Sequence, residues 1–363
     1  MSEAPILIMA GGTGGHVFPA LALARLLRER ERSVVWLGTR KGLEARIVPA
    51  DNFPIELLSV GGLRGKGIGT LLLAPFRLTG ALWQALTIMR KHRPAVVVGL
   101  GGFVTGPGGV AAWLCRRPLL IHEQNAIAGF TNRCLARLSR EVLTAFPDAF
   151  GAGVQTRVIG NPVRREIASL PPPAERFATR SGAIHLLVVG GSLGAARLNS
   201  VVPAALASVI ANSTLRFDVR HQAGERWADA ARASYARAAV VADVAPFIAD
   251  MAEAYAWADL VVCRAGALTI SELAAAGVGA VLVPFPAAVD DHQTHNGAFL
   301  VDQGAAILIS DRDLSVEKLG AELQRLCAGR GKLLAMAERA RLVAKPQAAE
   351  DLLRTCLSLA GAA

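Results

Sequence analysis

Short apolar runs that end in glycines and lead into helical patterns recur along the chain. The first run, Pro5 to Ala10, enters Gly11-Gly12-Thr13-Gly14-Gly15-His16, and helical spacing of leucine and alanine follows from about Pro19 to Arg30. A short apolar run bounded by glycine is typical of a buried strand, and proline suits the first turn of a helix. The same order returns at residues 94–114, 184–201 and 260–276. This repetition predicts an α/β fold with parallel sheets.

The restart of the pattern at residue 184 indicates two Rossmann-like domains with a cleft between them. A chain of 363 residues is long enough for two domains of ordinary size. The proline run Leu170-Pro171-Pro172-Pro173 interrupts the periodicity and is interpreted as a domain boundary or linker.

Glycines and polar residues follow the predicted strands of the first half. A second glycine turn spans Leu100 to Gly109, and the strand Pro118 to His122 ends in His122-Glu123-Gln124-Asn125. Because the carboxyl ends of parallel strands line one crevice, we expect both glycine turns and this tetrad to face the same cleft. Glycine turns before a helix are typical of phosphate sites, although they also occur without a ligand. His16, at the mouth of the first turn, is either a site residue or a helix cap.

The stretch from Cys263 to Asn296 has the pattern expected of an anion site followed by a sugar site. Ala265-Gly266-Ala267 would let a phosphate approach the backbone, and the helix from Leu268 to Ala276 would offer N–H donors in its first turn. Glu272, within that helix, could accept hydrogen bonds from two sugar hydroxyls. The segment Asp290 to Asn296 is predicted to be a polar loop for another polyol. An ordinary βαβ crossover is the alternative interpretation.

The net charge of +10 is unevenly placed along the chain. No acidic residue lies between Glu56 and Glu123, whereas the interval carries Arg64, Lys66, Arg77, Arg90, Lys91, Arg93, Arg116 and Arg117. This excess indicates an anionic partner, which could be nucleic acid, a membrane surface or an anionic substrate.

Residues 68–93 form a leucine-rich amphipathic pattern with basic flanks. Such a segment, too short to span a bilayer, is typical of an interfacial helix on an anionic membrane. The expected membrane contacts are Leu72, Leu73, Phe76, Arg77, Trp83, Arg90 and Lys91. A helix packed on the core is the alternative. Nucleic acid is not expected, because the segment lacks a series of stacking aromatics.

The composition, 52% hydrophobic and 19% charged, is that of a globular protein. The five cysteines are scattered and form no CxxC pair, which argues for reduced thiols and against a zinc site or disulfide framework. No basic region precedes the first apolar run, so we do not expect a signal peptide. No uninterrupted apolar stretch reaches the ~20 residues of a membrane-spanning helix.

The chain resembles the MurG family, the bacterial UDP-N-acetylglucosamine transferases that make lipid II in peptidoglycan synthesis. The resemblance is carried, in this order, by GGTGGHVFPALALA, GGFVTGPGG, HEQNAIAGFTN, GNPVR, GGSLGA, FIADMAEAYAWADLVVCRAGALTISELAAAG and DDHQTHN. It covers nearly the whole chain, and several motifs in one order make it specific.

This resemblance implies a glycosyltransferase type-B (GT-B) fold, with two Rossmann-like parallel-sheet domains facing each other across a cleft. Residues 1–163 would bind the acceptor and the membrane, residues 164–340 would bind the UDP-sugar, and residues 341–363 would pack back on the first domain. The enzyme would transfer N-acetylglucosamine from UDP-N-acetylglucosamine to lipid I, with inversion to a β-1,4 linkage and without metal or other cofactor. It would lie peripherally on the cytoplasmic face of the membrane, beside other cell-wall synthesis proteins.

The resemblance also implies roles for individual residues. The donor would contact Thr13, Gly14, Gly15, Asn125, Arg164, Ser192, Ile248, Ala267, Leu268, Thr269, Ile270, Ser271, Glu272 and Gln293. Ile248 would offer backbone groups to uracil, Glu272 would bind the ribose, and Gln293 would bind the N-acetylglucosamine. The acceptor would contact Gly11, Gly12, Gly102, Thr105, Gly106 and Glu123.

The acceptor hydroxyl needs a general base, and His16 is our choice because imidazole titrates near neutral pH. His122 and Glu123 are the rivals. Asp311-Arg312-Asp313 has the spacing of a metal-binding DxD motif, but Ser315 and Glu317 after it predict a turn into a capped helix. No metal site is expected there, nor at Asp290-Asp291-His292.

Three other functions stay open. One is a different UDP-sugar enzyme of the same fold, such as a lipid glycosyltransferase or an epimerase. Another is a dinucleotide oxidoreductase, although the chain lacks GxGxxG followed by an acid ~20 residues later. The third is a nucleic-acid-binding protein, which rests on charge alone.

Overall fold

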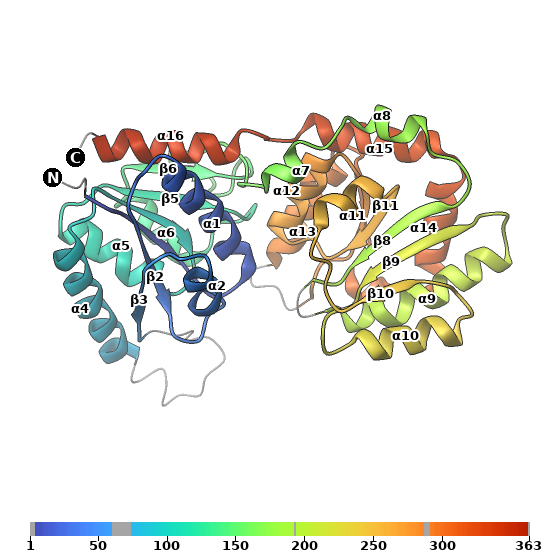
Figure 1. Cartoon of the computed structure of the whole chain (residues 1–363), viewed down its shortest axis with the longest axis horizontal. Coiled ribbons are helices and arrows are strands. Elements are labelled where there is room, and N and C mark those ends of the chain that lie inside the picture. Colours follow the sequence, from blue (N-terminus) through green and yellow to red (C-terminus); the bar gives the residue numbers. More distant parts are fainter. Residues whose placement is uncertain (1–3, 60–73, 192–193, 287–290, 362–363) are drawn as a thin grey trace. The chain divides into compact units, whose positions relative to one another are not determined.

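The computed structural model describes residues 4–59, 74–191, 194–286 and 291–361 (Figure 1). The chain forms two compact units, one of Met1–Pro162 with Pro346–Ala363 and one of Val163–Lys345. The proline run at 171–173 is therefore not the boundary, because it lies inside the second unit. The return to the first unit at Pro346 also comes later than the expected position 340/341.

The first unit, hereafter the N-terminal unit, is built on a parallel sheet in the order β3-β2-β1-β4-β5-β6-β7. The strands are β1 (Ile6–Ala10), β2 (Val34–Thr39), β3 (Ile55–Leu58), β4 (Val96–Gly101), β5 (Leu119–Glu123), β6 (Glu141–Thr144) and β7 (Arg157–Val158). The helices are α1 (Gly14–Glu29), α2 (Glu44–Ala50), α4 (Ala74–His92), α5 (Thr105–Leu114), α6 (Phe130–Ala136) and α16 (Ala348–Gly361). The strand order reverses between β1 and β4, so the carboxyl ends of these two strands form the crevice where ligands bind in such sheets.

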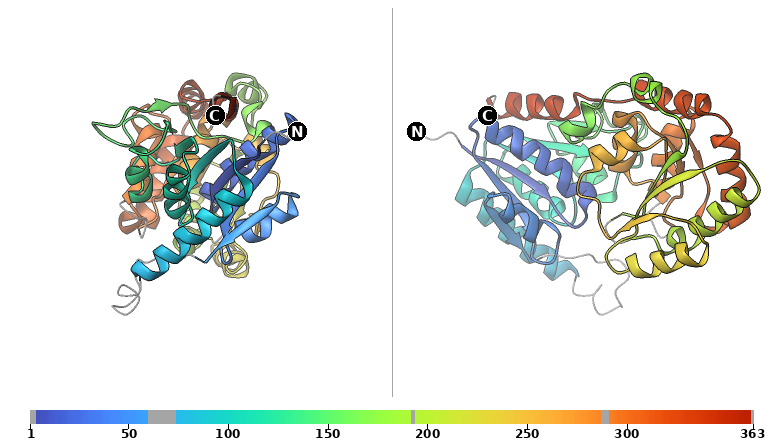
Figure 2. Two further views of the ribbon diagram at one scale, coloured as in Figure 1. Left: turned by 90° about the vertical axis from the view of Figure 1, so that its left-hand side faces the viewer. Right: turned by 45° about the vertical axis from the view of Figure 1, so that its right-hand side comes forward.

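Alternate side chains of β1 enter two separate cores. Ile6 and Ile8 pack in one core with residues of α1 and α16, and Leu7 and Met9 pack in the other with residues of α4 and α5. Helix α16 contributes Leu352, Leu353, Cys356 and Leu359 to the first core. It lies beside α1, as the right-hand view of Figure 2 shows. The last helix is thus part of the N-terminal unit.

The second unit, hereafter the C-terminal unit, has a parallel sheet in the order β10-β9-β8-β11-β12-β13. The strands are β8 (Ile184–Val189), β9 (Phe217–Gln222), β10 (Asp243–Ala245), β11 (Leu260–Cys263), β12 (Gly279–Leu282) and β13 (Ala306–Leu308). The helices are α7 (Arg165–Ala168), α8 (Pro173–Ala178), α9 (Ala196–Ala211), α10 (Ala228–Arg237), α11 (Met251–Trp257), α12 (Ala267–Ala276), α13 (His292–Val301), α14 (Val316–Cys327) and α15 (Arg330–Leu342). Its strand order reverses between β8 and β11, which places α12 at the corresponding crevice.

Two local predictions were wrong. Helix α1 begins at Gly14, so the last glycines of the first turn are already helical. The predicted polar loop is the start of α13, where Asn296, Gly297 and Leu300 are buried at helical spacing. Residues 343–347 separate α15 from α16, and proline at 346 interrupts the helix between them.

Candidate active site in two parts

The two glycine turns of the N-terminal unit are in backbone contact. The Gly11 N–H donates to the Gly101 carbonyl at 3.3 Å. Gly102 has a φ of +89°, and a Cβ added to it would lie 2.4 Å from the Gly11 oxygen. A side chain at Gly102 would therefore separate the turns, which explains the glycine in physical terms.

A buried carboxylate that sequence reasoning missed holds the first turn. Glu44 is fully buried, and its carboxylate accepts from the Gly12 N–H at 2.9 Å and from both the N–H and the hydroxyl of Thr39 at 2.8 and 2.7 Å. A Cβ at Gly42 would lie 2.0 Å from this carboxylate. Glu44 thus accepts a hydrogen bond from one backbone amide of the first glycine turn and stabilises the conformation of that turn.

His16 is half-buried in the first turn of α1, and its Nδ1 lies 2.9 Å from the Gln124 Oε1. Gln124 Nε2 lies 3.0 Å from His122 Nδ1, and His122 Nε2 lies 2.9 Å from the Gly160 oxygen. His122 is completely buried, which lowers the pKa of its imidazole. Gln124 was visible in the HEQN tetrad, but its link to His16 was not predicted.

Glu123 points into its own loop. Its Oε1 accepts from the backbone N–H and the side-chain amide of Asn125, and its Oε2 accepts from the Gly129 N–H and the Asn132 side chain. Because Glu123 is nearly fully buried and His122 completely so, His16 is the most exposed of the three base candidates.

The residues of the two glycine turns that are predicted to contact the donor or the acceptor differ in exposure. Gly12, Thr13, Gly14, Gly15, Gly102 and Gly106 are all at least partly exposed. Gly11 and Thr105 are buried, and the Thr105 hydroxyl is enclosed without a hydrogen-bond partner. Because the whole Thr105 residue is 0% exposed, this structure gives a ligand no direct access to it.

In the C-terminal unit, α12 begins at Ala267 after the N-cap residue Gly266, which has no side chain of its own to cap the first turn. Gly277 ends it in the left-handed conformation, with a φ of +64°. The N-terminus of such a helix carries about half a positive charge and favours anions. In the predicted run, Ala267 and Ile270 are buried while Leu268, Thr269 and Ser271 are partly exposed, so this first turn can present backbone donors.

Glu272 lies one turn further along α12 between two partners. Arg164 Nη2 lies 3.0 Å from its Oε1, and the Tyr255 hydroxyl lies 3.2 Å from its Oε2. Burial raises the pKa of the Glu272 carboxyl, and the Arg164 guanidinium opposes this effect. Burial also raises the pKa of Tyr255 well above its ordinary value, so the phenol stays protonated and donates. Tyr255 was not predicted.

The other donor-site candidates of this unit already have partners. The Ile248 N–H donates to the Gln222 Oε1 at 3.0 Å, which leaves the Ile248 carbonyl as the group available to a base. The Gln293 Oε1 accepts from the Phe285 N–H at 2.8 Å. Gln222 was not predicted either. Ser192 lies outside the described residues.

The two aspartates of the DxD-like segment already have partners within the chain. The Asp311 carboxylate lies 2.6 Å from Arg264 Nη1, and Asp313 accepts from the Ser310 hydroxyl. As predicted, Ser315 caps the following helix by accepting from the Lys318 N–H. Within the described part of the chain, no group of three His, Cys, Asp or Glu side chains could hold a metal ion.

The expected membrane-contact residues divide into two kinds. Phe76 and Trp83, 77% and 69% exposed on α4, are seven residues apart and share a face with Arg90. Arg77 is exposed as well, and the exposed Lys91 forms an ion pair with Glu56 at 2.7 Å. Leu72 and Leu73 lie outside the described residues. Among the described helices, none is long and apolar enough to cross a membrane.

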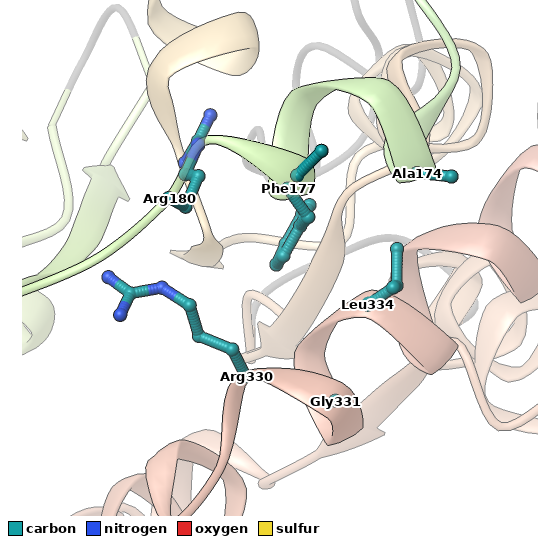
Figure 3. A pocket seen from close by; sticks show the side chains of 7 residues that line it. Ala174, Phe177, Arg180, Arg330, Gly331 and Leu334 are labelled. Atoms are coloured by element: carbon teal, nitrogen blue, oxygen red, sulfur yellow. The ribbon is translucent and has the colours of Figure 1, made fainter.

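No predicted site residue is among those that line a small hollow in the C-terminal unit. It encloses about 200 Å³ between α8 and the start of α15 (Figure 3), lined by Ala174, Phe177, Ala178, Arg180, Arg330, Gly331 and Leu334. Both arginines are already paired with Asp259. The hollow therefore adds nothing to the site.

Two family models match the chain. The glycosyltransferase family 28 N-terminal domain matches residues 6–144, and the glycosyltransferase family 28 C-terminal domain matches residues 185–352. Together with the two parallel sheets, these matches define a glycosyltransferase with the GT-B fold.

Curated relatives agree with the chain over its full length. A UDP-N-acetylglucosamine–N-acetylmuramyl-(pentapeptide) pyrophosphoryl-undecaprenol N-acetylglucosamine transferase of Marinobacter nauticus is 56% identical over 99% of both chains. Its counterpart in Alkalilimnicola ehrlichii is 56% identical over 97% of this chain and 98% of the relative. The crystal structure of Acinetobacter baumannii MurG is 41% identical, with a TM-score of 0.86 over 97% of this chain and 99% of that one. The chain therefore belongs to glycosyltransferase family 28 and, within it, to the MurG family.

A more distant structure shares the fold alone. The calicheamicin glycosyltransferase is 16% identical, with a TM-score of 0.67 over 99% of both chains.

Proposed function

We propose that the enzyme transfers N-acetylglucosamine from UDP-N-acetylglucosamine to the muramyl sugar of lipid I and so forms lipid II. The observation that carries this proposal is the start of α12 after Gly266, with Leu268 and Thr269 partly exposed and Glu272 one turn further on, in a chain 56% identical to a transferase named for these substrates. The new bond would be a β-1,4 linkage, formed with inversion at the anomeric carbon.

In this proposal the first turn of α12 binds the diphosphate. The helix dipole stabilises the charge that develops on departing UDP by up to ~2 kcal/mol in a partly buried site. Glu272 accepts from the ribose hydroxyls, and Arg164, Ser192 and the Ile248 backbone contact the nucleotide. Gln293 and Asn125 contact the N-acetylglucosamine. That the two domains face each other across a cleft stays a prediction.

The glycine turns of the N-terminal unit bind the acceptor pyrophosphate and bring its sugar hydroxyl to His16. The hydroxyl oxygen forms a bond to the anomeric carbon while the bond from that carbon to the UDP oxygen breaks. His16 takes the hydroxyl proton, and UDP leaves with the bonding electron pair.

Catalysis without metal is part of the proposal, because fixed backbone donors and arginines can stabilise the UDP leaving group. The Asp311–Arg264 ion pair supports metal-independent catalysis, because Arg264 already binds a carboxylate that a DxD metal site would need.

Peripheral membrane binding on the cytoplasmic face is also proposed, with the exposed face of α4 as the contact. Phe76 and Trp83 supply apolar anchors, and Arg77 and Arg90 supply positive charge. Each basic residue near an anionic surface contributes about 1 kcal/mol, so such binding is reversible.

The decisive experiment is transfer of radiolabelled N-acetylglucosamine to lipid I with a chelator present, compared with transfer to diacylglycerol. Label on lipid I alone supports the donor, the acceptor and metal independence together. Label on diacylglycerol would reassign the acceptor. The His16→Ala variant should lose turnover far more than UDP affinity, and equal losses of both would reduce His16 to a positioning role.

A further inference from the structure

Three hydrogen bonds connect the His16 ring to the backbone of Gly160. His16 Nδ1 lies 2.9 Å from Gln124 Oε1, Gln124 Nε2 lies 3.0 Å from His122 Nδ1, and His122 Nε2 lies 2.9 Å from the Gly160 oxygen. All four residues belong to the N-terminal unit.

The donor and acceptor in each of the three hydrogen bonds can be assigned by starting at Gly160. The Gly160 carbonyl can only accept, so His122 Nε2 carries a proton and donates. Complete burial keeps His122 neutral by lowering the pKa of its imidazole, so its Nδ1 is an acceptor.

The orientation of the Gln124 amide follows in turn. Its Nε2 faces two acceptors, His122 Nδ1 and the His122 carbonyl oxygen, each at 3.0 Å. A reversed amide would place its oxygen against both, so the NH₂ group faces His122 and the Oε1 faces His16. His16 must then donate from Nδ1, which leaves the lone pair on Nε2.

We propose that Gln124, oriented by His122, is a positioning residue that fixes the His16 tautomer with the proton on Nδ1 and the basic lone pair on Nε2. The proposal rests on the proposed function only in giving Nε2 a substrate proton to accept. A histidine base needs its other ring nitrogen held in this way, as a buried carboxylate does in the Ser-His-Asp triad. A neutral amide does so with less stabilisation of the charged imidazolium than a carboxylate would give.

The backbone beneath the ring supports the same geometry. A Cβ added to Gly101 would lie 2.6 Å from His16 Nδ1, so the imidazole packs directly on this glycine. The ring is therefore held from one side by Gly101 and at its Nδ1 edge by Gln124.

The direct test is the tautomer of His16 in the unaltered full-length protein. The chain has seven histidines, and ¹⁵N-histidine NMR at about pH 8.5, where an ordinary imidazole is neutral, reports the proton position of each. His16→Gln identifies the signal. We expect the Nδ1–H tautomer for His16, and an Nε2–H signal would overturn the proposal.

A variant extends the test to catalysis. Gln124→Met keeps the length of the side chain, but methionine cannot accept the hydrogen bond from His16 Nδ1 as the amide oxygen does. The ¹⁵N signal of His16 should therefore move toward that of the Nε2–H tautomer. Turnover should fall about 10- to 100-fold, less than the ~10⁴-fold loss when a carboxylate is removed from such a triad, with UDP affinity unchanged. Gln155→Met, on an exposed residue of the same unit, is the matched control.

The outcomes separate this proposal from the proposed function. If the unaltered enzyme transfers no sugar to lipid I, the proposed function fails while the NMR signal still decides the tautomer. If Gln124→Met shifts the tautomer but keeps full turnover, the positioning role is wrong.

Discussion

The guanidinium of Arg164 and the carboxylate of Glu272 lie 3.0 Å apart in the C-terminal unit, although 108 residues separate them in sequence. Arg164 precedes α7 at the start of this unit, and Glu272 lies on α12. With Tyr255 on the second carboxylate oxygen, the pair holds Glu272 in one position before a ligand binds. This preorganisation leads to the first prediction.

Glu272→Gln should weaken UDP-N-acetylglucosamine binding about 10- to 100-fold, because hydrogen bonds to a charged group contribute about 1.5–3 kcal/mol. Isothermal titration calorimetry measures the loss. Glu338→Gln, on an exposed residue of the same unit, should bind normally. Unchanged affinity in Glu272→Gln would remove the ribose role.

Donor affinity should also depend on pH through the same carboxyl. As the pH is lowered, protonation of Glu272 should weaken donor binding. Because burial raises the pKa of Glu272, this weakening should begin at a higher pH than it would for an ordinary glutamate. The sign for folding is opposite: a raised carboxyl pKa means that stability is lost as pH rises through it. Calorimetric titrations at several pH values should show this dependence in the unaltered chain and not in Glu272→Gln.

Replacing Phe76 and Trp83 together by serine should release the protein from anionic vesicles. Burying a large apolar side chain contributes about 1.5–3 kcal/mol, so even partial insertion of two predicts at least about a tenfold loss of vesicle affinity. Vesicle sedimentation measures it, with UDP affinity unchanged. Val241→Ser is the control, because Val241 is 91% exposed on the other unit. Equal sedimentation of all three proteins would exclude α4 as the contact.

His221 should make the C-terminal unit sensitive to acid. Its Nδ1 lies 3.0 Å from the Tyr235 hydroxyl, its Nε2 lies 3.0 Å from Asn199 Oδ1, and burial lowers its pKa to about 4. Between an unfolded pKa near 6.5 and this value, only the unfolded state binds the proton. As the pH is lowered through this window, the free energy of unfolding therefore decreases by up to about 3 kcal/mol.

Hydrogen exchange of the β9 amides at pH 7 and about pH 4.5, inside that window, measures this loss. In His221→Gln the pH-dependent part should disappear, whereas the exposed His295→Gln should retain it. An unchanged slope in His221→Gln would assign the acid sensitivity to other groups.

Glu44→Gln should distort the first glycine turn. The carboxylate accepts three hydrogen bonds, and an amide would point two protons at buried donors. An unsatisfied buried donor costs about 1–3 kcal/mol, and kcat/KM for lipid I should fall while UDP affinity is kept. Urea unfolding and transfer assays measure both effects. The exposed Glu29→Gln is the control, and wild-type behaviour of Glu44→Gln would exclude the role.

The sequence was informative where one local pattern has one structural solution. The apolar runs of β1, β4, β8 and β11 fit only strands buried on both faces of a parallel sheet, and the glycines after them fit only sharp turns. The short strand β3, with Glu56 inside it, has no such pattern and was missed. Its position beside α4 brings Glu56 to Lys91, so one expected membrane contact takes part in an ion pair.

Site partners far apart in sequence could not be predicted in the same way. Glu44 and Gly12 are 32 residues apart, and Gln124 and His16 are 108 residues apart, so only the folded sheet shows that they meet. Part of the HEQN arrangement was accessible, because alternate residues of an extended chain point to opposite sides. That period places His122 with Gln124 and turns Glu123 away.

The packing of α16 sets an order of events during synthesis. Leu352, Leu353 and Cys356 belong to the same core as Ile6 and Ile8, although the whole C-terminal unit is translated between them. The C-terminal unit has all its residues once Lys345 has been added. The unit that emerges first from the ribosome must therefore wait, with an apolar face uncovered, until the final helix has been made.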